Sequence, residues 1–224
     1  LTEVFHQSNN VLSELTNKNL TYLHMWGENL QSTSSEEEIR DYIKKAREDA
    51  GFVEFYFLSA EGNYKVVTGN TGYLGLQENI EEEIRKGNDV IANAAVPGKS
   101  QLLIFATPKA HGIYQGFEYD AIAIAYENSD IVNVLDISAF NENAQSFVVH
   151  PDGRVVVNHS SASWGNVYNF FGVLREHSDM SEKEINELSE KFKAGRTDAM
   201  LLNLDGMSYY LVYEKSDIQD WMFL

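Results

Sequence analysis

The sequence has no cysteine and little positive charge. Without thiols, a disulfide framework, thiolate catalysis and cysteine-ligated zinc are all excluded. Only 17 residues are Lys or Arg, against 34 Asp or Glu, so the formal net charge is −17. Because phosphate groups would be repelled, nucleic acids and anionic bilayers are disfavoured as main partners.

Long hydrophobic runs are missing as well. No apolar stretch approaches the roughly 20 residues needed to span a bilayer, and no signal peptide is visible. The chain opens within a helical pattern and stops on Trp221–Leu224, which is typical of a fragment excised from a longer protein. Its 224 residues, 43% of them hydrophobic, can bury a real core in one large domain or two small ones.

The most informative positive feature is an internal similarity. Two segments, Phe57–Val67 and Phe147–Val157, each place an acidic residue and a glycine in a turn between β-branched and aromatic residues. This pattern predicts a β-hairpin. The two turn glycines, Gly62 and Gly153, lie 91 residues apart. We also expect Ala121–Glu127 and Tyr209–Glu214 to be matching closing strands, so the sequence predicts two similar α/β modules in tandem.

The first 50 residues predict two helices. Apolar residues recur at close to helical spacing from Leu1 to about Gln31. A second helix is predicted to begin at Ser35, where Glu38 completes a capping box, and to end before Gly51.

The following segment predicts a five-stranded antiparallel sheet and a short acidic helix over Gln77–Lys86. The predicted strands are Phe52–Leu58, Tyr64–Thr68, Asp89–Val96, Gln101–Thr107 and Tyr119–Glu127. We expect Gly69–Gly75 to be a glycine-rich loop and His111–Gly116 to be a turn.

A linking helix is predicted from Asn128 to about Phe140. Beyond the Phe147–Asn158 hairpin, the sequence predicts an irregular stretch over Ser160–Gly172 and then a helix capped by Ser181 and Glu184. The predicted strands that follow are Ala199–Leu204, Met207–Glu214 and one beginning at Trp221.

This order of elements resembles the double Cache family, whose members are extracytoplasmic sensor domains of bacterial chemoreceptors, histidine kinases and diguanylate cyclases. The resemblance is carried by Asn79–Ala94, by the strand entering Ile122–Ile131 and by the Phe147–Asn158 hairpin. It implies an α+β fold with a long N-terminal helix followed by two PAS-like modules. The implied divisions are residues 1–50 for the helices, 51–127 for a membrane-distal ligand-binding module, 128–143 for a linking helix and 144–224 for a membrane-proximal module.

The resemblance also implies a role and partners. We expect an extracytoplasmic small-molecule sensor domain with its ligand in the distal module, flanked by transmembrane helices in the full-length protein. A homodimer through the long N-terminal helix is expected from the family. No cofactor and no enzymatic activity are expected for this fragment, although the full-length protein can carry a kinase or cyclase output domain.

Relatives that bind amino acids hold the ligand carboxylate with an Arg-x-Trp-Tyr run before the short helix. They hold its ammonium with an Asp at the end of the fifth strand. This sequence has Leu76–Ile80 at the first place, and at the second we align Tyr126. Because a carboxylate clamp needs a guanidinium or an equivalent group, an α-amino-acid ligand is disfavoured.

The fifth strand separates small from bulky side chains. Ala121, Ala123 and Ala125 alternate with Ile122, Ile124 and Tyr126, and alternate residues of a strand point to opposite faces. We predict that the alanines lie against the long helix and that the Ile/Tyr face looks into a cavity. The alternative is a sheet covered on both sides with no cavity.

The candidate pocket residues are aromatic or neutral and polar, which suits an uncharged or weakly charged small molecule. They are Tyr56, Tyr73, Gln77, Asn79, Asn93, Thr107 and Tyr126. For each of them an ordinary structural role is the alternative.

Other site types find no support in the sequence. The six histidines show no zinc-type spacing, so no metal site is predicted. His159-Ser160-Ser161 lacks the Gly-x-Ser-x-Gly elbow of a hydrolase. The main alternative to a sensor is a ligand-free module that binds another protein or serves a structural role, and an enzyme is the third hypothesis.

Overall fold

The computed structural model describes residues 2–32, 35–76, 80–95, 101–108, 110–135, 145–159, 167–217 and 220–224. The chain forms two compact units. We call residues 14–130 the first module, and residues 1–13 together with 131–224 the second module. Among the described residues, no helix combines the length and the apolar character needed to cross a membrane.

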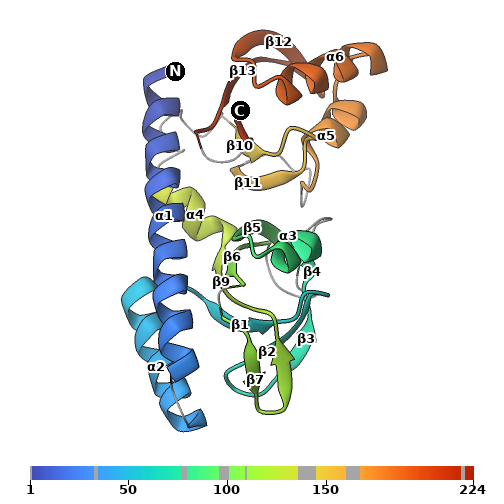
Figure 1. Cartoon of the computed structure of the whole chain (residues 1–224). Helices are drawn as coiled ribbons and strands as arrows, with labels where there is room; N and C mark the ends of the chain where they lie inside the picture. The colour runs from blue at the N-terminus through green and yellow to red at the C-terminus, as the bar shows by residue number, and fades with distance from the viewer. Residues whose placement is uncertain are drawn as a thin grey trace. The chain divides into compact units, whose positions relative to one another are not determined.

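Two helices open the chain (Figure 1). α1 spans Thr2–Ser32 and α2 spans Glu36–Ala50, as the sequence predicts. The capping box of α2 is confirmed, since Ser35 accepts the Glu38 N–H and Glu38 bonds back to the Ser35 backbone. Gly51 ends α2 with φ of 76°, a left-handed conformation that glycine adopts at little cost.

The first module is built around a seven-stranded antiparallel sheet with strand order β3-β2-β1-β9-β6-β5-β4. Its strands are β1 (Glu54–Leu58), β2 (Asn63–Val66), β3 (Thr71–Tyr73), β4 (Gly75–Leu76), β5 (Val90–Ala95), β6 (Leu102–Thr107) and β9 (Ala121–Glu127). The short helix α3 (Ile80–Lys86) joins β4 to β5.

Two corrections apply to this module. The segment predicted as a glycine-rich loop contributes β3 and β4, because its backbone groups pair with β2 and β5. The predicted turn over His111–Gly116 lies within a separate ribbon made of β7 (Gly112–Tyr114) and β8 (Phe117–Tyr119). Short edge strands of this kind carry too few residues for a clear alternating pattern.

The prediction for the two faces of the sheet is wrong. The Ile/Tyr side of β9 packs on α1: a Cβ at Gly27 would lie 3.6 Å from Ile122 Cδ1, and the Tyr126 hydroxyl bonds Asn19. The alanines lie on the opposite side, with Ile80 and Ile84 of α3. The close approach that we attributed to alanines on the strand is provided by glycine on the helix, because a Cβ at Gly27 would also meet the Ala110 Cβ at 2.9 Å.

The second module contains a five-stranded antiparallel sheet with order β11-β10-β14-β13-β12. Its strands are β10 (Ser146–Val149), β11 (Val155–His159), β12 (Asp198–Leu204), β13 (Met207–Lys215) and β14 (Met222–Phe223). The helices are α4 (Asn128–Leu135), α5 (Phe170–His177) and α6 (Glu182–Lys193), of which α4 begins in the first module. α5 was not predicted, whereas α6 has the predicted capping box of Ser181 and Glu184.

The internal similarity is confirmed in detail at the two predicted turns. Ser59 N–H donates to Asn63 O at 2.8 Å, and His150 N–H donates to Arg154 O at 2.8 Å. Gly62 and Gly153 each have φ of 85°. The same three-residue turn with a left-handed glycine therefore closes both hairpins.

Strand order supports the repeat but corrects one correspondence. β2-β1-β9-β6-β5 in the first module and β11-β10-β14-β13-β12 in the second both follow the order second, first, fifth, fourth, third. β9 therefore corresponds to β14, and β13 corresponds to β6. The expected match between Ala121–Glu127 and Tyr209–Glu214 is wrong. Both segments contain Tyr-Glu, but β9 is the fifth strand of its repeat and β13 is the fourth.

Candidate functional site

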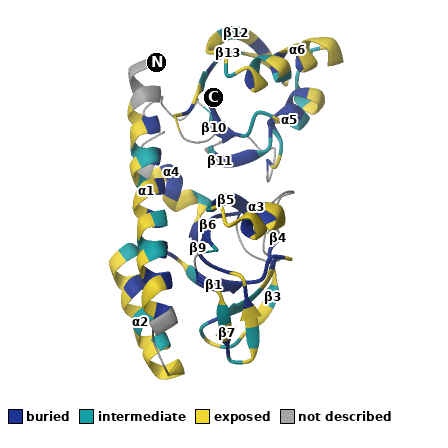
Figure 2. Cartoon of the chain, in the orientation of Figure 1, coloured by how far each residue is buried: buried dark blue, intermediate teal, exposed yellow. Residues whose placement is uncertain are grey.

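The side of the first sheet that faces away from α1 has a floor of small side chains, which we call the alanine face. Figure 2 shows that β5, β6 and β9 are largely buried. The buried residues of this face are Tyr56, Leu58, Ala60, Val66, Leu74, Ile80, Ile84, Val90, Ala92, Ala94, Leu102, Ile104, Ala106, Ala121, Ala123 and Ala125. Its seven alanines are at most 3% exposed, so this face is covered in the structure.

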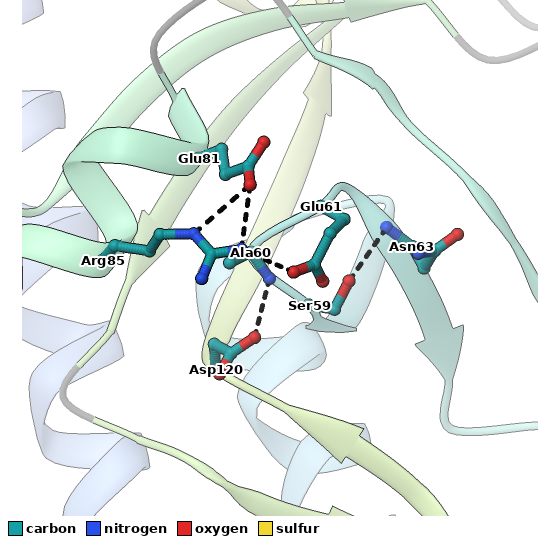
Figure 3. A network of polar contacts seen from close by, with 7 residues as sticks. All are labelled: Ser59, Ala60, Glu61, Asn63, Glu81, Arg85 and Asp120. Carbon is teal, nitrogen blue, oxygen red and sulfur yellow. Dashed lines mark hydrogen bonds and ion pairs between the residues drawn. The ribbon is translucent and has the colours of Figure 1, made fainter.

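α3 covers part of this face, with Ile80 and Ile84 buried against it. A polar network fixes the helix to the turn between β1 and β2 (Figure 3). Arg85 Nη2 lies 2.6 Å from Glu61 Oε1 and 2.9 Å from Glu81 Oε1. Asp120 Oδ2 accepts the Ala60 N–H of the same turn at 2.8 Å.

Tyr56 is the polar side chain at the centre of the alanine face. It is 1% exposed, pairs with Ala123 across β9 and meets the Tyr64 ring edge-on at 4.9 Å. Burial raises the pKa of its hydroxyl, with the Glu54 carboxylate adding to the shift. No described residue forms a hydrogen bond with this hydroxyl. Because a tyrosine hydroxyl can both donate and accept a hydrogen bond, Tyr56 can pair with a polar group of a bound molecule.

Two charged groups, Glu54 and Glu127, stand at the same end of the alanine face. Glu54 pairs with Ala125 across the sheet and is neutralised by Arg47, whose Nη2 lies 2.8 Å from Glu54 Oε1. Glu127 ends β9, pairs with Leu102 of this face and is exposed. Strand alternation gives Glu127 the same side as Ala125. Sequence reasoning missed Glu127 because we assigned the other side of β9 to the cavity.

Tyr126, the leading sequence candidate, lies on the α1 side of the sheet. Its hydroxyl is 2.9 Å from Asn19 Oδ1 and 3.1 Å from the Ala50 carbonyl oxygen. Burial raises its pKa to about 12, so the hydroxyl keeps its proton and serves as a donor. This geometry gives Tyr126 a structural role between α1, α2 and β9.

The remaining candidates do not gather at one site. Asn93 pairs with Leu103, which pairs with Tyr126, so Asn93 shares the α1 side. Thr107 pairs with Ile122 and lies on that side as well. Tyr73, on edge strand β3, is 59% exposed. Gln77 and Asn79 lie outside the described residues.

Of the five described candidates, Tyr56 alone belongs to the alanine face. Ligand contact by any of the seven predicted residues stays a prediction.

Two other site types were considered over the described part of the chain. There, no three His, Asp or Glu side chains come together in a way that could hold a metal ion. α6 carries a surface depression of about 730 Å³, lined by Lys183, Asn186, Glu187, Glu190, Lys191, Ala194 and Arg196. Two of its cations are paired with carboxylates, Lys183 with Glu187 at 3.7 Å and Lys191 with Asp198 at 2.9 Å.

Comparison with known proteins gave a match at the level of structure. No protein-family model and no curated protein sequence matches the chain. The ligand-binding domain of the Pseudomonas aeruginosa PAO1 amino acid chemoreceptor PctB, in complex with L-Arg, is similar with a TM-score of 0.67 and 14% identity. That match covers 100% of this chain and 91% of the PctB chain.

Two further structures are similar over nearly the whole chain. The extracellular domain of a proposed histidine kinase, mmHK1S-Z3, has a TM-score of 0.64 and 12% identity, covering 99% of this chain and 91% of the other. The sensory domain of the Campylobacter jejuni chemoreceptor Tlp3, with isoleucine bound, has a TM-score of 0.55 and 8% identity, covering 99% and 88%. The predicted α+β fold, a long helix followed by antiparallel sheets of the double Cache type, is confirmed.

Proposed function

We propose that this chain, which has the fold of double Cache sensor domains, senses a small molecule for a membrane-bound bacterial signalling receptor. The first module is the membrane-distal, ligand-binding part, and the second module is membrane-proximal. In this proposal the domain lies outside the cytoplasm, is flanked by transmembrane helices, and pairs with a second copy through α1. The output is that of a histidine kinase, a diguanylate cyclase or a chemoreceptor. The fold shared with sensor domains rather than with catalytic domains supports a non-enzymatic role.

The observation that carries the proposal is the Tyr56 hydroxyl. The Tyr56 side chain is 1% exposed at the centre of a floor that includes seven alanines, and no described residue forms a hydrogen bond with its hydroxyl. A ligand held between the alanine face and α3 would supply a hydrogen-bond partner for this hydroxyl.

Glu127 defines the chemistry that we expect of the ligand. It stands on the alanine face at the end of the fifth core strand, where amino-acid-binding relatives carry the Asp that holds an ammonium. The two guanidinium groups that border the described part of this face are both paired with carboxylates, Arg47 with Glu54 and Arg85 with Glu61 and Glu81. The ligand class we propose is therefore a small amine with an apolar body and without an essential carboxylate.

This expectation differs from the ligands of the similar structures. The PctB domain is in complex with L-Arg and the Tlp3 domain has isoleucine bound, and both ligands carry a carboxylate. The Leu76–Ile80 run of this chain offers no arginine to pair with such a group. Because a carboxylate requires a bidentate or charged partner when it is buried, these ligands are disfavoured.

The experiment is a thermal-shift screen of primary amines, amino acids and neutral metabolites at millimolar concentration. We expect one or more amines to raise the melting temperature and Glu127→Gln to abolish the shift. Glu118→Gln is the matched control, since Glu118 is an exposed carboxylate on β8 outside the alanine face. A silent screen, or an amine response that survives Glu127→Gln, would contradict the proposal.

A protein-binding module is the second candidate, and one surface favours it. Leu201 and Tyr210 are cross-strand partners on the outer face of the β12–β13 hairpin and are 76% and 63% exposed. An exposed apolar pair of this kind can mark a contact with another protein. Pull-down with the domain and with a Leu201→Ser/Tyr210→Ser variant tests this candidate: a partner retained by both would argue against this surface.

A further inference from the structure

Within the first module, the inward stripe of α1 contains two buried polar residues, Thr16 and Asn19, where apolar residues are expected. Its buried positions include Thr16, Asn19, Leu23 and Trp26, at spacings of three and four residues. Thr16 and Asn19 are 4% and 1% exposed. The Tyr126 hydroxyl satisfies Asn19 Oδ1, but Asn19 Nδ2 and Thr16 Oγ1 find no hydrogen-bond partner among the described residues.

A third unsatisfied group belongs to Gln101, the residue before β6. Gln101 is 8% exposed, and its Nε2 also lacks a partner in the described part of the chain. Strand alternation gives it the side of Leu103, which pairs with Tyr126 on the α1 side. Its carbonyl oxygen accepts the Asn128 N–H at 3.1 Å, so Gln101 stands level with the end of β9.

The register between α1 and β9 brings these groups to one place. Gly27 lies beside Ile122, and Asn19 bonds Tyr126. From Gly27 back to Asn19 is eight residues, about 12 Å along a helix, and from Ile122 to Tyr126 is four residues, about 13 Å along a strand. α1 therefore runs antiparallel to β9. Thr16 lies a further ~4.5 Å along the helix, which brings it level with the Gln101–Asn128 pair.

We propose that Thr16, Asn19 and Gln101 share one buried water molecule between α1 and the sheet of the first module. A water oxygen accepts hydrogen bonds from the two amide N–H groups, and one of its protons goes to the threonine oxygen. Buried waters in proteins typically make about three such bonds to groups that would otherwise be unsatisfied. A buried anion is disfavoured, because no counter-charge is among these three side chains and desolvating a charge is costly.

The proposed water would join α1 to two strands. Thr16 and Asn19 belong to the helix, Gln101 precedes β6, and Asn19 is bonded to Tyr126 of β9. β6 and β9 supply much of the alanine face on their other side. The bridge would hold the helix in one register against these strands, and this conclusion does not depend on the identity of any ligand.

The sign of one substitution tests the proposal. Thr16→Val keeps the shape and nearly the same helix propensity but removes the hydroxyl. If a water is bound, we expect the variant to unfold more readily, with the unfolding equilibrium constant raised about tenfold and the melting temperature lowered. If the hydroxyl is truly unpaired, the melting temperature rises instead, because an unsatisfied buried group has been replaced by an apolar one. An unchanged or raised melting temperature overturns the proposal.

Thr21→Val is the matched control, since Thr21 lies on the exposed side of α1. Gln101→Met removes the proposed water's partner on the sheet, so its melting temperature tests the proposal even if Thr16→Val does not fold. Because both residues would hold the same water, the Thr16→Val/Gln101→Met double variant should lose little more than the worse single variant. Strictly additive losses would contradict a shared bridge.

Crystallography identifies the bridging species. We expect one density peak within about 2.7–3.2 Å of all three side-chain atoms. An anomalous peak at this position after bromide exchange would show that an anion binds there instead of water, and it would overturn the assignment.

Discussion

Replacing Tyr126 with phenylalanine separates the structural role of this residue from the ligand-binding role that its sequence position suggested. The hydroxyl is 2.9 Å from Asn19 Oδ1 and 3.1 Å from the Ala50 carbonyl oxygen, and the side chain is 7% exposed. Tyr126→Phe removes about 1 kcal/mol of net hydrogen bonding, and it leaves buried acceptors on α1 and α2 without this donor. We expect the free energy of unfolding to fall by about 2 kcal/mol in total.

Urea denaturation followed by circular dichroism measures this change. Tyr73→Phe is the matched control: the same atom is removed from a side chain that is 59% exposed, and the expected change is within about 0.5 kcal/mol. Because Tyr126 faces α1, the response to any stabilising compound should persist in Tyr126→Phe. A variant that keeps wild-type stability but loses ligand binding would refute the assignment of the two sheet faces.

Three further changes have defined outcomes. Gly153→Ala should lower the free energy of unfolding of the second module, measured by urea denaturation, by more than about 2 kcal/mol, because φ is +85° and the added Cβ would clash with the Phe171 ring. Gly206→Ala is the control: its φ is +79° but the space around it is open, so the loss in the same assay should be only about 1 kcal/mol. Arg85→Ala should leave the melting temperature in calorimetry nearly unchanged, since the Arg85 and Glu61 side chains are each 55% exposed; a clear decrease would mean that the network of Figure 3 holds α3 more firmly than surface ion pairs do. Burial, and to a smaller extent the Arg154 charge, lower the pKa of His150 in the folded state, so below the ordinary histidine pKa of 6.5 the unfolded chain binds more protons than the folded one. The free energy of unfolding should therefore be highest above pH 6.5 and fall as the pH drops. A His150→Gln variant with the same pH dependence would contradict this account.

Much of the fold could be predicted from short-range signals. The capping boxes at Ser35 and Ser181 and the glycine turns at Gly62 and Gly153 all form as expected. These features depend on a few neighbouring residues, whose conformation is largely set by local hydrogen bonding and backbone sterics. α5 was missed because Ser160–Gly172 was predicted to be irregular, although Asn169 caps the helix.

The candidate site was harder to predict, because the decisive information is the choice of which side of the sheet faces α1. The alternation along Ala121–Glu127 correctly separates two faces, but it does not say which face the helix covers. That choice depends on Gly27, 94 residues before Ala121, which lets the helix approach Ala110 and Ile122. Neighbouring residues of a strand point to opposite faces, so choosing the wrong face led us to Tyr126 in place of Glu127.

The most direct test of the central claim is a crystal structure of the domain with any compound that raises its melting temperature. We predict density for the compound on the alanine face, beneath α3, with one of its atoms within hydrogen-bond distance of the Tyr56 hydroxyl. Density on the α1 side beside Tyr126 and Asn93, or no density for the compound on the alanine face, would contradict the account.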